Sequence, residues 1–195
     1  MDNRLLWYTT RGAGVVTLIL FTAVMVLGLL ARLRVESPGW PRFLTAAVHR
    51  DLSLTALGLL LLHIITAVVD PFTHLGITAA VIPFGSSYRT VWLGLGTVAF
   101  ELMLAVVITS LVRRHIGAGL WRFVHWLAYA SWPVAVLHGL GTGTDGGSPW
   151  LQAVTGACVA TVIAATGWRV VAAPGDPLAG ERRVAVAGAT REPRG

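Results

Sequence analysis

The chain has few charged side chains and almost no cysteine. Only 12% of its 195 residues are Asp, Glu, Lys or Arg, whereas a soluble domain has about a quarter. This scarcity excludes an ordinary soluble domain. The one cysteine, Cys158, excludes an internal disulfide and says nothing about the compartment. No period-2 alternation of apolar and polar residues recurs along the chain, which argues against a transmembrane β-barrel.

The chain is rich in long apolar stretches, and 55% of its residues are hydrophobic. Five stretches reach the length of about 20 residues that a helix needs to cross the hydrocarbon core. The first is longer than the apolar part of a signal peptide, so we expect it to remain as a helix. The five stretches are residues 13–33, 45–69, 91–112, 120–140 and 150–173.

These stretches predict an all-α membrane protein, a bundle of five transmembrane helices within residues 1–173. Residues 174–195 are rich in Pro, Gly, Ala and Arg. That composition predicts a disordered tail.

Lysine is absent, so all 15 basic residues are arginines. With five crossings, Arg4, Arg11 and Arg89 lie on one side of the membrane. The positive-inside rule then places the N-terminus outside the plasma membrane and the tail in the cytoplasm. This asymmetry and anionic lipid account for the net charge of +6 without nucleic acid. The cytoplasmic side holds Arg32, Arg34, Arg42, Arg50, Arg113, Arg114, Arg122, Arg169, Arg182, Arg183, Arg191 and Arg194.

Four histidines lie inside apolar stretches, where histidine is rare and usually functional. His49 and His63 belong to the second stretch. Their separation of fourteen residues is about four turns less 40°, so the two share a helix face about 21 Å apart. Ala56 lies midway on that face. In a hydrocarbon core about 30 Å thick, one histidine lies toward each leaflet.

His125 and His138 repeat the layout in the fourth stretch. Thirteen residues place them about 19.5 Å apart along a helix, but about 140° apart around it. Pro133 lies between them and can kink or re-wind the helix. The second and fourth helices run parallel, because one crossing separates them, so each membrane level offers one imidazole from each helix. We therefore expect two b-type haems between these helices, each with two histidine axial ligands, an arrangement suited to electron transfer.

Three arginines are candidate partners for the haem propionates. Arg50 and Arg122 lie near the cytoplasmic histidines, and Arg89 lies on the external side. Guanidinium and carboxylate groups form paired hydrogen bonds. The same arginines also suit an interfacial role in which they extend toward the headgroups. Glu101, in the middle of the third stretch, has three open roles: a hydrogen bond to a neighbouring helix, proton transfer, or contact with a quinone.

The two histidine pairs resemble those of the ferric reductase-like transmembrane domain family. This family includes ferric reductases, NADPH oxidases and the haem-binding partner of bacterial methionine sulfoxide reductase. The resemblance covers residues 43–141. It implies one haem across His49 and His125 and another across His63 and His138. It also implies that electrons enter from a cytoplasmic flavin domain, a flavoprotein or quinol, and leave toward the outer face.

Two departures from the family pattern are visible. The family core usually has six helices with ligands on the third and fifth, whereas this chain has five with ligands on the second and fourth. We also expect no flavin or nicotinamide domain after the last helix. We therefore expect the electron donor to be a separate flavoprotein or a membrane quinol.

The function we expect is that of a di-haem b cytochrome, the electron-transfer subunit of an oxidoreductase. It would pass electrons from a cytoplasmic donor to an external acceptor such as ferric iron or a redox protein. Two alternatives remain open. One is a quinone-linked cytochrome b subunit that anchors a dehydrogenase or reductase, and the other is a haem-free membrane transporter whose histidines bind metal or protons.

Overall fold

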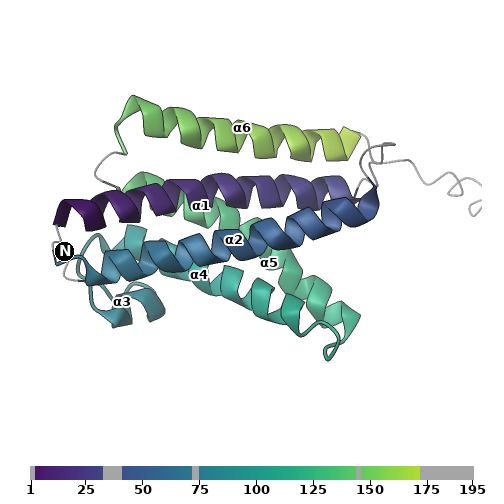
Figure 1. The fold of residues 1–195 in the computed structure, drawn as a ribbon, viewed down its shortest axis with the longest axis horizontal. Coiled ribbons are helices and arrows are strands. Elements are labelled where there is room, and N and C mark those ends of the chain that lie inside the picture. The colour runs from purple at the N-terminus through teal and green to yellow at the C-terminus, as the bar shows by residue number, and fades with distance from the viewer. Residues whose placement is uncertain (1–2, 33–40, 72–74, 144–145, 172–195) are drawn as a thin grey trace, which may run out of the picture.

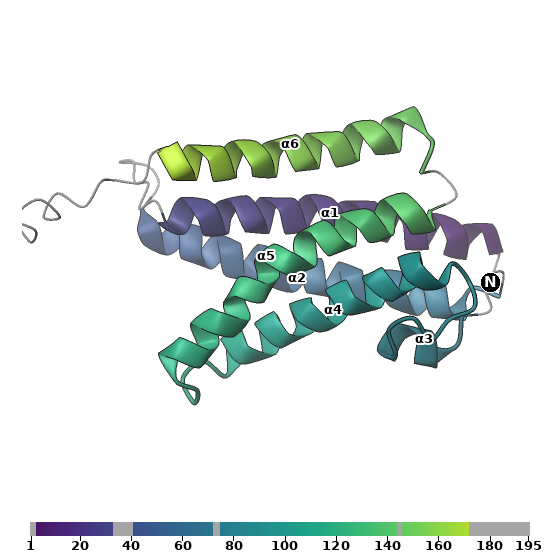
Figure 2. The same ribbon diagram turned by 180° about the vertical axis from the view of Figure 1, so that it is seen from behind.

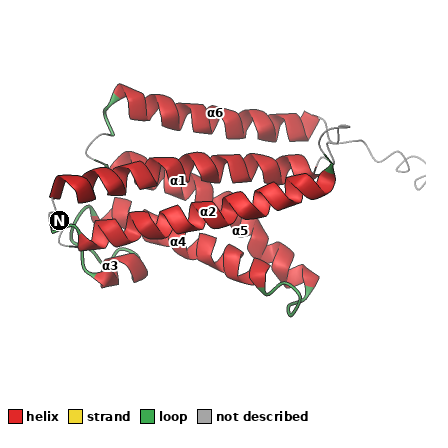
Figure 3. Ribbon diagram, in the orientation of Figure 1, coloured by secondary structure: helices red, strands yellow, loops and turns green. Residues whose placement is uncertain are grey.

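The computed structural model describes residues 3–32, 41–71, 75–143 and 146–171. The tail predicted for residues 174–195 lies outside these ranges. The described residues form helices and connecting turns without a strand (Figure 3). The helices are α1 (Asn3–Arg32), α2 (Arg42–Val69), α3 (Ile77–Val81), α4 (Thr90–Leu111), α5 (Ala118–Thr142) and α6 (Pro149–Val171).

Four of these helices, α1, α2, α4 and α6, are long and apolar enough to cross a membrane. Each of the five predicted apolar stretches falls largely within one long helix, and the fourth stretch corresponds to α5. Helix α5 is not among these four, because two histidines, Arg122 and several aromatic residues with polar atoms lower its mean hydropathy. The described part of the chain is thus an all-helical protein with four candidate membrane spans.

The structure adds helical residues to the predicted stretches in two places. Helix α1 begins at Asn3, ten residues before the predicted start. Hydropathy detects the apolar stretch but not a helix that continues beyond it. In this added segment, the Arg11 guanidinium carbon lies 4.1 Å from the centroid of the Trp7 ring. Residues 70–90, which lie between two predicted apolar stretches, contain α3, and the Thr97 hydroxyl of α4 donates to the Ala79 carbonyl of α3 at 2.9 Å.

The long helices form two antiparallel hairpins with one additional helix. Helices α1 and α2 pack along each other, and so do α4 and α5, while α6 packs on α1. Figures 1 and 2 show α1 between α2 and α6, with the α4–α5 hairpin crossing this layer. The turn between α4 and α5 spreads away from the start of α2. The hairpins therefore meet most closely away from that turn.

The core lies where α1, α4, α5 and α6 meet. The indole N–H of Trp132 on α5 donates to the Thr22 hydroxyl on α1 at 3.0 Å, and both side chains are buried. The Thr22 hydroxyl in turn donates to the Leu18 carbonyl at 2.8 Å. This chain of hydrogen bonds ties the second hairpin to the first. The buried apolar cluster consists of Phe21, Met25, Met103, Trp132, Val136 and Cys158.

Replacing Trp132 with Phe tests this link. The substitution removes the indole donor and some buried ring surface, so we expect the free energy of unfolding to fall by about 1–2 kcal/mol. Thermal and denaturant unfolding in a fixed detergent, followed by circular dichroism, measures the change. Trp168→Phe is the matched control, because Trp168 is 65% exposed on α6. Equal losses in the two variants would contradict a special role for the Trp132 hydrogen bond.

Candidate functional site

The four membrane histidines form two pairs across α2 and α5. The ring centroids of His63 and His138 are 6.3 Å apart, and those of His49 and His125 are 6.4 Å apart. We call His63 and His138 the first pair and His49 and His125 the second pair. The first pair lies toward the end of the bundle that carries α3. The structure therefore brings together the partners that the sequence predicted at each level.

Both histidines of α5 reach α2 although thirteen residues separate them. Helix α5 continues through Pro133 and bends along its length (Figure 2). Proline removes one backbone hydrogen bond of the helix and favours such a bend. Helix α5 also crosses α2 obliquely, so the direction from α5 to α2 rotates along the helix. Bend and crossing together compensate for the 140° separation expected on a straight helix.

Backbone carbonyls of neighbouring helices orient three of the four rings. The Nδ1–H of His63 donates to the Thr10 carbonyl at 2.6 Å, and that of His49 donates to the Val24 carbonyl at 3.2 Å; both carbonyls belong to α1. The Nδ1–H of His138 donates to the Trp92 carbonyl of α4 at 2.9 Å. A carbonyl only accepts, so Nδ1 carries the proton and Nε2 keeps its lone pair. The three rings therefore present the nitrogen that can bind a metal.

Glycines lie against the same three rings, and two of them leave no room for a side chain. A Cβ added to Gly14 would lie 2.9 Å from Cε1 and Nδ1 of His63, which is too close, whereas one added to Gly28 would lie 3.5 Å from Cε1 of His49, an ordinary contact. A Cβ at Gly96 of α4 would clash with the ring of His138. These glycines are not among the site residues predicted from the sequence. One indication was present, because Gly14 and Gly28 are separated by fourteen residues, as are His49 and His63.

The ring of His125 is held in a different way. It stacks on Trp121, one turn earlier on α5, with ring centroids 5.0 Å apart and an interplanar angle of 29°. The indole N–H of Trp121 donates to the Ser110 hydroxyl of α4 at 3.3 Å. An aromatic side chain anchored to α4 therefore positions this histidine.

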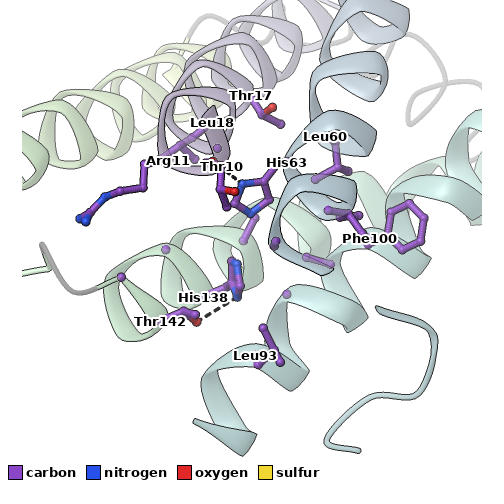
Figure 4. Close-up of a pocket in the computed structure, with 18 of the residues that line it drawn as sticks. Thr10, Arg11, Thr17, Leu18, Leu60, His63, Leu93, Phe100, His138 and Thr142 are labelled. Atoms are coloured by element: carbon purple, nitrogen blue, oxygen red, sulfur yellow. Dashed lines mark hydrogen bonds between the residues drawn. The ribbon is translucent and has the colours of Figure 1, made fainter. Parts of the chain in front are cut away.

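The first pair lines a cavity of about 300 Å³ between α1, α2, α4 and α5 (Figure 4). Its volume lies at the lower end of the range of about 300–1,000 Å³ that is usual for ligand and cofactor sites. Apolar side chains such as Leu60 and Phe100 form much of the wall. Arg11 also lines the cavity. From the sequence, this cationic residue was used only to predict the orientation of the chain in the membrane.

The three predicted arginine partners lie on the surface. Arg50 is exposed, and its Nε donates to Asp51 at 2.9 Å. Arg122 is also exposed. Arg89 has a left-handed backbone, with φ 41°, and its guanidinium donates to the Gly141 carbonyl in the last turn of α5. Arg89 does not line the cavity of the first pair, so in the structure its contact is with the end of α5.

Comparison with known proteins identifies one family. The model of the family described as ferric reductase like transmembrane component matches residues 13–136. The match includes α1 from Ala13 onward and extends through His125, and His138 follows two residues after its end. No curated protein and no solved structure gives a match. Because the family model covers more than half of the chain, the protein belongs to the ferric reductase-like transmembrane family.

Proposed function

We propose that this member of a membrane electron-transfer family is a di-haem b-type cytochrome. The supporting observation is the separation of the paired imidazoles, 6.3 and 6.4 Å between centroids. Metal–imidazole bonds are about 2 Å long, and ring bonds of about 1.33 Å give an imidazole a radius of just over 1 Å. Two imidazoles on opposite sides of one metal ion therefore have centroids about 6.3 Å apart. Both pairs fit a six-coordinate iron between them.

The number of ligands favours haem over a bare metal ion. Within the described residues, no three His, Cys, Asp or Glu side chains come together. A structural zinc ion usually takes four protein ligands. The porphyrin of haem leaves only two axial positions for the protein, and each histidine pair supplies two. We therefore propose His49 with His125 and His63 with His138 as axial ligands of two haems per chain.

The chain's own groups prepare these positions for electron transfer. Hydrogen bonds from Nδ1 to backbone carbonyls fix the ring orientation and make Nε2 a stronger ligand. The apolar wall of the cavity keeps water away from the first pair. Held by a histidine on each side, such a haem would supply one-electron transfer chemistry and would have no position left for a further ligand.

A direction of transfer follows from the arginines. We propose that α5 is the fifth crossing, since its 25 residues span about 37 Å. Arg113, Arg114 and Arg169 then lie on the cytoplasmic side, with the N-terminus outside.

This orientation gives the direction of electron transfer. The donor, a separate flavoprotein or quinol, would deliver electrons at the second pair. The first pair would pass them to ferric iron or a redox protein outside, with Arg11 beside the cavity as a candidate propionate partner.

The visible spectrum of the purified protein tests the assignment directly. We expect a b-type reduced-minus-oxidised spectrum and close to two haems per chain by the pyridine haemochrome assay. His63→Ala and His138→Ala should each remove the same haem, because both are ligands of one iron, and should leave the other in place. Folded protein without haem, despite adequate haem supply, would overturn the proposal. Two intact haems in either variant would overturn the pairing.

The glycine that accommodates His138 gives a second test. Gly96→Ala places a methyl group against the imidazole, so the ring must shift and its bond to the iron weakens. We expect retention of the first-pair haem to fall about tenfold or more, as is usual when the supporting shell of a ligand is disturbed. Transfer of haem to an excess of a soluble haem acceptor measures this loss. Gly58→Ala on α2 is the matched control, because its Cβ would have nothing within 4 Å. Similar haem loss in both variants would contradict the positioning role.

A further inference from the structure

Glu101 lies in the middle of a candidate membrane span and on the outer surface of the bundle. It is the twelfth residue of the 22 in α4, and its side chain is exposed. It follows Gly96, which contacts His138, by about 7.5 Å along the helix axis, and precedes Ser110 by about 13.5 Å. Glu101 is therefore at a depth between the two histidine levels.

A carboxyl group at this depth is unfavourable unless it is neutral, paired or hydrogen-bonded. Glu101 makes no hydrogen bond or ion pair with any residue that the structure describes. The first of its three open roles, a hydrogen bond to a neighbouring helix, is thus not seen within the described part of this chain. We therefore expect Glu101 to be neutral at this depth or to meet a partner outside the described bundle.

The surface around Glu101 is open on one side and closed on the other. One turn earlier on α4, Thr97 is buried and bonded to α3, and Phe84 packs over Gly94. Toward the turn between α4 and α5 the side of the helix that carries Glu101 is open, and Ile108 is 49% and Leu111 66% exposed. We call this surface the α4 face, made up of Glu101, Ile108, Leu111 and Val112. Glu101 is its one polar member.

The distribution of charge favours contact of the α4 face with its own copy. The described arginines of the long helices all lie among the first or last nine residues of their helices, away from the depth of Glu101. Asp51, exposed on α2, is already paired with Arg50. The described surfaces of the same protein thus offer no cation at this depth. A two-fold axis along the membrane normal would instead place both copies of Glu101 at the same depth.

We propose that the α4 face is a homodimer interface in which the two Glu101 carboxyl groups, both protonated, hydrogen-bond each other. A protonated carboxyl group is self-complementary, because its hydroxyl donates and its carbonyl oxygen accepts. The pair is neutral, so no uncompensated charge is left in the hydrocarbon core. The apolar side chains of the α4 face would pack beside it. The proposal does not depend on haem.

The experiment measures the oligomeric state of the full-length protein in liposomes, by single-molecule photobleaching over a series of protein-to-lipid ratios. We expect a reversible dimer for the wild type. Glu101→Leu should weaken it by about 3- to 20-fold, the range that membrane hydrogen bonds span. Glu101→Gln should retain it, because an amide also donates and accepts. Haem content and circular dichroism of each variant show that the fold and the proposed cofactor sites are intact.

A second pair of variants tests the apolar part of the interface. Ile108→Trp adds bulk to the α4 face and should prevent association while Glu101 is unchanged. Ile163→Trp, at a residue 65% exposed on α6, is the matched control and should remain dimeric. A wild type that is monomeric at all ratios would overturn the proposal. So would a dimer that neither Glu101→Leu nor Ile108→Trp weakens.

Discussion

The rest of the site depends on the hydrogen bonds from imidazole Nδ1–H to backbone carbonyls of the adjacent helix. Each such bond requires a backbone to lie against a ring, so α1 must approach α2 closely and α4 must approach α5 closely. Glycine at 14 and 96 allows that approach because it has no Cβ. In a membrane, where helices gain little from hydrophobic association, close packing and hydrogen bonds of this kind decide which helices pair. The two hairpins are the consequence.

Between the two hairpins, by contrast, the helices that carry paired histidines must not pack closely. The rings that face each other must stay far enough apart for a metal to lie between them, as the separations of 6.3 and 6.4 Å show. The buried cluster around Trp132 and Phe21 joins the hairpins at a depth between the histidine levels. Trp132 adds a directional hydrogen bond to Thr22. The cluster thus sets the spacing of the hairpins without occupying the space between paired rings.

Helix α4 has different chemistry on its two faces. Its inner face presents Gly96 and the Trp92 carbonyl to His138, and its outer face presents Glu101 beside exposed apolar side chains. Both features fall within one 22-residue span. A helix of this kind can support the histidine site on one side and meet a second molecule on the other. Because the two faces share one rigid element, any partner on the outer face would contact the helix that positions His138.

The amino-acid sequence by itself determined that the chain is a helical membrane protein, and where its apolar stretches lie. It also determined the spacing of His49 and His63, because helical periodicity converts sequence separation into face and depth. It did not reveal that α1 begins at Asn3, since hydropathy does not report helical residues outside the apolar stretch. The alignment of His138 with His63 depended on the bend and the oblique crossing of α5, which no local pattern encodes. Only the tertiary structure decided that Gly14 lies against an imidazole and that Glu101 faces outward, because both depend on which helix lies beside which.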